Sequence, residues 1–139
     1  MDVEINLLAV FLAMVSSMVV GTIWYARSVF GNDWAKLAKV DLKKASKNSS
    51  KPIIVTVFVS LITAYVLAHF AFFTNQFFGN SFLQDSLTAA FWLWVGFTAT
   101  RFITHDAFEG RPAKLTAINL GNELATIMLM GLIIGLLGY

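Results

Sequence analysis

The stretch that decides the fold is residues 115–139, LTAINLGNELATIMLMGLIIGLLGY. It is long enough to cross a bilayer, because a transmembrane helix needs about 20 predominantly apolar residues. Asn119, Asn122 and Glu123 interrupt this apolar run. A charged side chain at such a depth is costly, and an intramembrane ionisable residue is therefore a candidate functional site. Glu123 is the residue whose surroundings the fold must explain.

The whole chain has the composition of a membrane protein. Its 139 residues are 58% hydrophobic and 13% charged, whereas soluble domains are about 45–50% apolar and about 25% charged. Four stretches are apolar enough to span a bilayer: residues 5–25, 53–73, 87–103 and 115–138. We therefore predict an all-α fold, a single transmembrane domain over residues 1–139 that forms a bundle of four transmembrane helices. The absence of cysteine excludes disulfides, thiolate nucleophiles and cysteine-ligated metals.

The basic residues predict which loops face the cytoplasm. Every Lys and Arg lies in or beside two predicted loops, residues 27–52 and 104–114. The positive-inside rule places both loops in the cytoplasm, so that both termini and residues 74–86 face outward. We therefore predict a multi-pass protein of the bacterial cytoplasmic (inner) membrane. The strong charge bias also favours parallel over antiparallel homo-oligomers.

A short helix is expected in the first basic loop, between the first two spans. Asn32 or Asp33 can cap it. One face of this helix is apolar while lysines occupy the others, which is typical of a helix lying in the membrane interface. Three aromatic residues are predicted to anchor this region at the membrane surface: Trp24, Tyr25 and Trp34.

Polar residues from several spans are expected at one depth in the membrane. On the last span, Thr116, Asn119 and Glu123 recur at spacings of three and four residues and so share a helix face. A helix rises about 1.5 Å per residue, and serines and threonines of the first two spans reach the same depth as Glu123. The candidate polar site contains Glu123, Asn119, Asn122, Ser16, Ser17, Ser60 and Thr63, with Arg101 reaching inward as a cationic partner.

Glycines on the last span indicate close helix packing. Gly131 and Gly135 form a G-x-x-x-G motif, and Gly121 belongs to a second row of small residues. Small faces let helix backbones approach closely. The pattern leaves open whether these faces pack within one chain or between chains.

The two predicted hairpins resemble each other. Thr56 follows Pro52 by four positions, and Thr116 follows Pro112 at the same offset. A tandem hairpin repeat, about an axis along the membrane normal, is one explanation of this spacing. Shared topology is the other.

Two motifs give the chain a family resemblance. The first is GTIWY at residues 21–25, followed by Phe30-Gly31 and Trp34; the second is FEGRP at residues 108–112, followed by Leu115, Ile118-Asn119 and Gly121. In these motifs the chain resembles the small bacterial membrane proteins of domain of unknown function seventeen-sixty-one (DUF1761). The resemblance implies a four-span membrane protein and assigns no activity. Members often carry an aromatic residue or histidine where this chain has Asn122 and Glu123, so it implies no role for Glu123.

Two functions fit these residues. The favoured one is a non-enzymatic assembly or accessory component, because Asn, Ser and Thr side chains often only hold membrane helices together. The alternative is a small homo-oligomeric channel or transporter for a cation, proton or small solute, using the polar layer around Glu123. An enzyme is not expected, because one carboxylate and one interfacial histidine make no acid–base pair at matched depth. No cofactor, metal or nucleic acid is expected; the expected partners are the lipid bilayer and a parallel homo-oligomer or another membrane protein.

Overall fold

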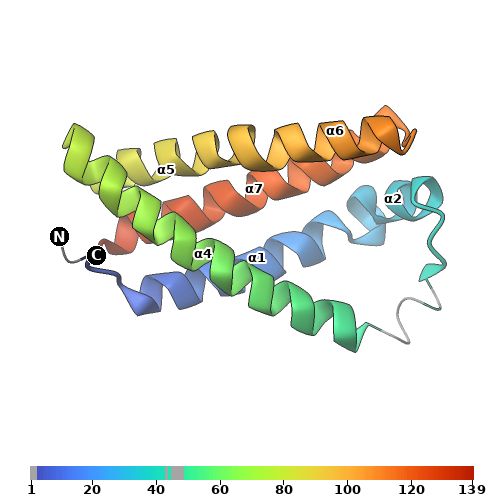
Figure 1. The fold of residues 1–139 in the computed structure, drawn as a ribbon. Helices are drawn as coiled ribbons and strands as arrows, with labels where there is room; N and C mark the ends of the chain where they lie inside the picture. Colours follow the sequence, from blue (N-terminus) through green and yellow to red (C-terminus); the bar gives the residue numbers. More distant parts are fainter. Residues whose placement is uncertain (1–2, 43, 45–48) are drawn as a thin grey trace.

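The computed structural model describes residues 3–42, 44 and 49–139, and every regular element within them is helical. The predicted all-α class is therefore confirmed. The elements are α1 (Leu7–Trp24), the π-helical turn η1 (Arg27–Gly31), α2 (Asn32–Leu37), α4 (Ser50–Phe78), α5 (Phe82–Leu93), the π-helical turn η2 (Trp94–Ala99), α6 (Thr100–Phe108) and α7 (Ala113–Leu137). Figure 1 shows them packed side by side as an elongated molecule.

Local sequence explains where the helices begin and end. The side-chain oxygen of Asn6 accepts hydrogen bonds from two backbone N–H groups at the start of α1. Helix α4 continues past residue 73, where the apolar run ends, because nothing stops it before Gly79. That glycine adopts a left-handed conformation with φ of 67°, which suits a helix C-terminus. Ser81 then caps α5 by accepting a hydrogen bond from the Gln84 N–H.

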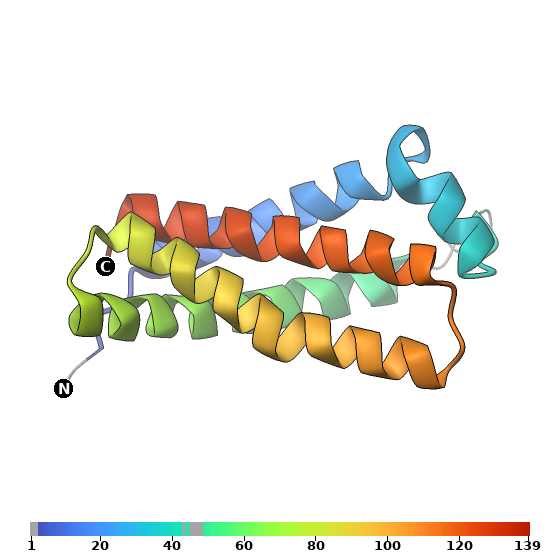
Figure 2. The ribbon, with the colours of Figure 1, turned by 90° about the horizontal axis from the view of Figure 1, so that it is seen from above.

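Three helices are long and apolar enough to cross a membrane: α1, α4 and α7. The third predicted span, residues 87–103, is not one of them. It lies within α5, η2 and α6, each too short to qualify alone. Trp94 and Thr100, where these elements meet, have helical backbone angles. Figures 1 and 2 accordingly show residues 82–108 as one continuous rod, called the α5–α6 rod below.

The buried core lies toward the end of the molecule that holds both termini. Its members come from the first half of α1, the second halves of α4 and α7, and α5: Ala9, Val10, Ala13, Ala64, Leu67, Ala68, Ala71, Ala89, Ala90, Ile127, Met130 and Ile134. Seven of these twelve residues are alanine, whose small side chain lets helix backbones approach closely. Toward the other end, the first half of α4 diverges from the α5–α6 rod (Figure 1).

The two basic loops lie at one end of the molecule and both termini at the other (Figure 1). At the basic end, the Lys114 ammonium donates a hydrogen bond to the Asp33 carboxylate, 2.6 Å away, and so links α7 to α2. This hydrogen bond and the positive charge of Lys114 lower the pKa of Asp33. At the opposite end, the Asn6 amide donates to the Leu137 carbonyl over 3.4 Å.

The predicted cap of α2 is wrong. No side chain caps this helix; it follows η1 directly, and the Asn32 amide donates instead to the Arg27 carbonyl, 3.0 Å away. The Gly31 N–H closes the π-helical turn on the Ala26 carbonyl. A side chain at Gly31 would overlap the Tyr25 carbonyl oxygen, so glycine permits this tight entry into α2.

Candidate functional site

The end of α1 is held against α7 by Trp24. Its indole N–H donates to the Ile118 carbonyl, 3.0 Å away. The indole ring also lies over Gly121, because a Cβ atom at that glycine would come within 2.7 Å of the ring. The small residue at Gly121 therefore serves contact between two helices of the same chain.

Tyr25 makes the next contact between the same helices. Its hydroxyl donates to the side-chain oxygen of Asn119 over 3.1 Å, and its ring packs edge-on against Trp34 with centroids 5.3 Å apart. The three aromatic residues predicted as membrane anchors thus also contact protein. Their position at the membrane surface stays a prediction.

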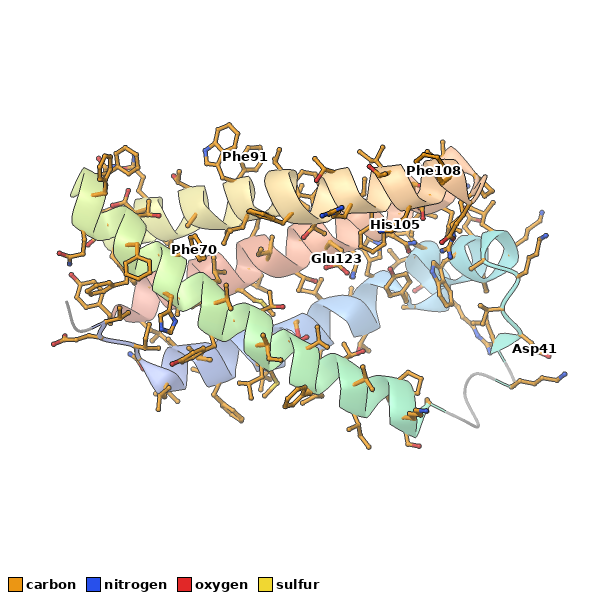
Figure 3. The ribbon with its side chains drawn as sticks, in the orientation of Figure 1. Asp41, Phe70, Phe91, His105, Phe108 and Glu123 are labelled. Carbon is orange, nitrogen blue, oxygen red and sulfur yellow. The ribbon has the colours of Figure 1, made fainter. Side chains whose placement is uncertain are left out.

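A cavity of about 700 Å³ lies beside these contacts, between α1, α4, η2 and α7. Its polar lining residues are Ser17, Thr22, Tyr25, Thr56, Ser60, Thr63, Thr98, Asn122, Glu123 and Thr126. Five residues predicted from sequence are brought together here: Glu123, Asn122, Ser17, Ser60 and Thr63. Figure 3 shows Glu123 near the middle of the molecule, whereas Phe91 and Phe108 lie at its outer surface.

Glu123 is the acidic residue of this cavity. It is partly buried and lies about 15 Å along α7 from Ala113. No described residue gives its carboxylate a hydrogen bond or an ion pair. The neighbouring Asn122 side-chain oxygen is buried and also has no hydrogen-bond partner within the described part of the chain. The Glu123 carboxylate is therefore left for a ligand or water, whereas the Asn122 oxygen is enclosed by protein atoms.

Several hydroxyl groups of the cavity lining have their hydrogens engaged elsewhere. Each donates to the carbonyl oxygen three or four residues earlier in its own helix, over 2.7–3.0 Å: Ser17, Thr22, Thr56 and Thr63. A hydroxyl has one hydrogen and two lone pairs. Toward the cavity these four groups can therefore act only as hydrogen-bond acceptors.

Three predicted site residues lie elsewhere. Arg101 is exposed on α6, has no polar partner among the described residues and does not line the cavity, so its predicted pairing with Glu123 is wrong. Its place on the outward face of the α5–α6 rod explains this. Ser16 donates a hydrogen bond to the Ala13 carbonyl and lies outside the cavity lining. Asn119 also lies outside the lining, and its side-chain oxygen accepts a hydrogen bond from the Tyr25 hydroxyl.

The prediction also missed lining residues. Thr56 shares a helix face with Ser60 and Thr63, at spacings of four and three residues, so periodicity could have identified it. Thr98 has no such signal, because it lies in η2, where a π-helical turn changes the direction of the side chains.

The glycines of the G-x-x-x-G motif pack against α5 of the same chain. A Cβ atom at Gly131 would lie 2.9 Å from the Ala90 Cβ, and one at Gly135 would lie 2.7 Å from the Leu83 Cα. The sequence left open whether these faces pack within or between chains. They pack within the chain and carry no evidence for an oligomer.

Two buried aspartates stabilise the interhelical turns. Asp85, at the start of α5, accepts hydrogen bonds from the Asn75 and Asn80 amides, each over 2.9 Å. Asp106, at the end of α6, accepts one from the Thr116 hydroxyl over 2.6 Å and lies 3.6 Å from the Arg111 guanidinium. Both carboxylates have partners, whereas Glu123 has none within the described residues.

Three long apolar helices packed beside a polar cavity indicate a helical membrane protein. A family model, described as Protein of unknown function (DUF1761), matches residues 8–135, and the chain belongs to this family. The resemblance predicted from the sequence motifs is therefore confirmed. The two motifs also meet in space, since Trp24 and Tyr25 contact Ile118, Asn119 and Gly121. No curated protein and no solved structure is similar enough to match.

Proposed function

We propose that the chain crosses the membrane four times, with the α5–α6 rod as the third span. The rod is about 40 Å long, enough for a hydrocarbon layer of about 30 Å. Arg101 lies near the basic end of the rod, where a long side chain can extend to the membrane surface. Because the π-helical turn keeps a helical backbone, it leaves few backbone groups to satisfy in lipid.

The proposed orientation places the basic loops in the cytoplasm of a bacterium and both termini outside. It is supported by the position of both loops at one end of the molecule (Figure 1). The chain has no cysteine, so single cysteines can report sidedness. In intact cells, Gln76→Cys should react with a membrane-impermeant maleimide, and Lys39→Cys should react only after permeabilisation. The opposite labelling would refute this orientation.

We infer that the protein binds a small cation in the cavity and carries it across the membrane. The observation that carries this proposal is Glu123, an acidic residue within a cavity of about 700 Å³ that has no counter-charge from any described residue. Ionisable side chains inside a membrane are costly and mark ion and substrate pathways. An exclusively structural carboxylate would be paired, as Asp85 and Asp106 are. The cavity thus favours transport over the accessory role.

The same cavity supports a non-enzymatic role. Glu123 and Tyr25 are the ionisable groups among its described lining residues. The Tyr25 hydroxyl already donates to Asn119. Acid–base catalysis is commonly divided between two titratable groups, one acting as acid and one as base, and this lining offers one group that is free to take either role.

Uptake into proteoliposomes tests the proposed function. Cations of several kinds should be compared: sodium, potassium, ammonium and alkylammonium ions. The variant Glu123→Gln should reduce uptake of the transported cation at least tenfold, because it removes the negative charge and keeps the side-chain volume. Glu4→Gln is the matched control, since it makes the same change at an exposed residue outside the cavity. Equal uptake by wild-type protein and Glu123→Gln would refute the role of Glu123.

A further inference from the structure

The arrangement of hydrogen-bond acceptors in the cavity defines what kind of cation fits. We propose that the ligand is a protonated primary amine with an apolar body, held by its N–H groups, rather than a metal ion or a fully alkylated ammonium. This inference rests on the proposed function above, because it requires that a cation binds beside Glu123.

Two adjacent residues of α7, Asn122 and Glu123, have side-chain oxygens without a hydrogen-bond partner among the described residues. The Glu123 carboxylate accepts no hydrogen bond from a described residue and lines the cavity. The Asn122 side-chain oxygen also has no hydrogen-bond partner among the described residues, but it is enclosed by protein atoms. A buried acceptor that lacks a hydrogen bond is costly. An alkylammonium group carries three donors and no acceptor, so one such group can satisfy several oxygens at once.

The hydroxyl groups of the cavity lining can also act as hydrogen-bond acceptors. Four of them, Ser17, Thr22, Thr56 and Thr63, donate their hydrogens to helix carbonyls, and Tyr25 donates to Asn119. Toward the cavity these five groups present lone pairs only. The hydroxyls of Ser60, Thr98 and Thr126 have no partner among the described residues and can rotate to accept as well. The lining therefore favours a ligand rich in donors.

The volume and charge of the cavity further restrict the chemical class of the ligand. A cavity of about 700 Å³ lies within the range of about 300–1,000 Å³ that is usual for organic ligands, and it exceeds what a dehydrated metal ion fills. One carboxylate matches one positive charge. Apolar side chains complete the walls and suit a hydrocarbon body: Met18, Ile53, Val55, Val59, Ile127 and Met130.

Calorimetry on the full chain in lipid nanodiscs tests this inference with two matched probes. Hexylammonium and hexyltrimethylammonium share their charge and hydrocarbon chain, but only the first has N–H donors. Hexylammonium should bind at least tenfold more tightly to the wild-type protein. Empty nanodiscs correct for partition into lipid. Glu123→Gln should lose hexylammonium binding, and Glu4→Gln should keep it.

Thr63→Val separates recognition from structural support. It removes one acceptor from the cavity and nearly preserves the side-chain shape. Hexylammonium affinity should fall severalfold, whereas hexyltrimethylammonium affinity should not change. An equal loss for both probes would mean that Thr63 acts on cavity shape, and it would count against N–H recognition.

The outcomes distinguish this inference from the proposed function. Equal binding of the two probes, both dependent on Glu123, would overturn recognition of N–H groups and leave cation binding in place. Binding of sodium or potassium alone, again dependent on Glu123, would overturn the amine and likewise leave cation binding in place. Absence of binding by every cation tested would overturn both.

Discussion

Adding one methyl group at Gly135 should force helices α5 and α7 apart. The new Cβ atom would lie 2.7 Å from the Leu83 Cα and 3.2 Å from the Ser86 Cβ. Carbon atoms prefer a separation of about 3.5–4.0 Å, so the backbones must move by about 1 Å. Rotation of a side chain cannot relieve a clash with a backbone atom. Overpacking of this kind costs about 1–3 kcal/mol, against about 1 kcal/mol gained by replacing glycine with alanine in a helix.

Gly21→Ala is the matched control for Gly135→Ala. Gly21 also lies inside a helix, but a Cβ atom there would meet nothing within 4 Å. Gly21→Ala should therefore raise the free energy of unfolding by about 1 kcal/mol, the gain expected when alanine replaces glycine in a helix. The free energies of unfolding of the two variants should differ by about 1–3 kcal/mol. Unfolding in mixed micelles, followed by circular dichroism, measures this difference. Equal stability of the two variants would refute the close packing of α5 against α7.

Three further changes test individual contacts. Trp24→Phe keeps an aromatic ring but loses the indole hydrogen bond, and should lower the free energy of unfolding by about 0.5–1.5 kcal/mol; an unchanged unfolding midpoint would contradict the contact. Because Lys114 lowers the pKa of Asp33, their ion pair stabilises the fold above the ordinary aspartate pKa of about 3.9 and is lost as pH falls through the lowered value. Stability should thus fall less on acidification in Asp33→Asn than in the wild type; parallel pH profiles would show that the pair contributes nothing. Asp85→Ala removes the carboxylate that accepts hydrogen bonds from the Asn75 and Asn80 amides, and should cost about 1.5–3 kcal/mol. Asp85→Asn should have an intermediate stability; wild-type stability of the alanine variant would refute this role.

Hydropathy predicted most of the helical architecture because lipid-spanning helices need long apolar runs. Their ends were harder to predict. Helix α4 ends at Gly79 rather than at the last apolar residue of its run, because backbone conformation and not hydropathy stops it. The α5–α6 rod was predicted as a plain span, and its π-helical turn η2 has no apolar signature in the sequence.

The candidate site was predicted in part. Counting residues along helices placed Ser17, Ser60 and Thr63 at the depth of Glu123, and all of them line its cavity. Depth alone does not give the direction of a side chain. The prediction that Arg101 pairs with Glu123 failed for this reason, since Arg101 is exposed on its helix and does not line the cavity.

The sequence by itself determined that this protein is helical, that it belongs to the DUF1761 family and that it carries an acidic residue far inside an apolar helix. Those features follow from local composition and from motifs. Tertiary structure decided which helices share a face: it turned Gly131 and Gly135 toward α5, set Trp24 on Gly121 and left Glu123 without a partner among the described residues. The physical reason is that rotation of each helix about its axis depends on how side chains of distant segments fit together. Composition and spacing along one helix do not contain that information.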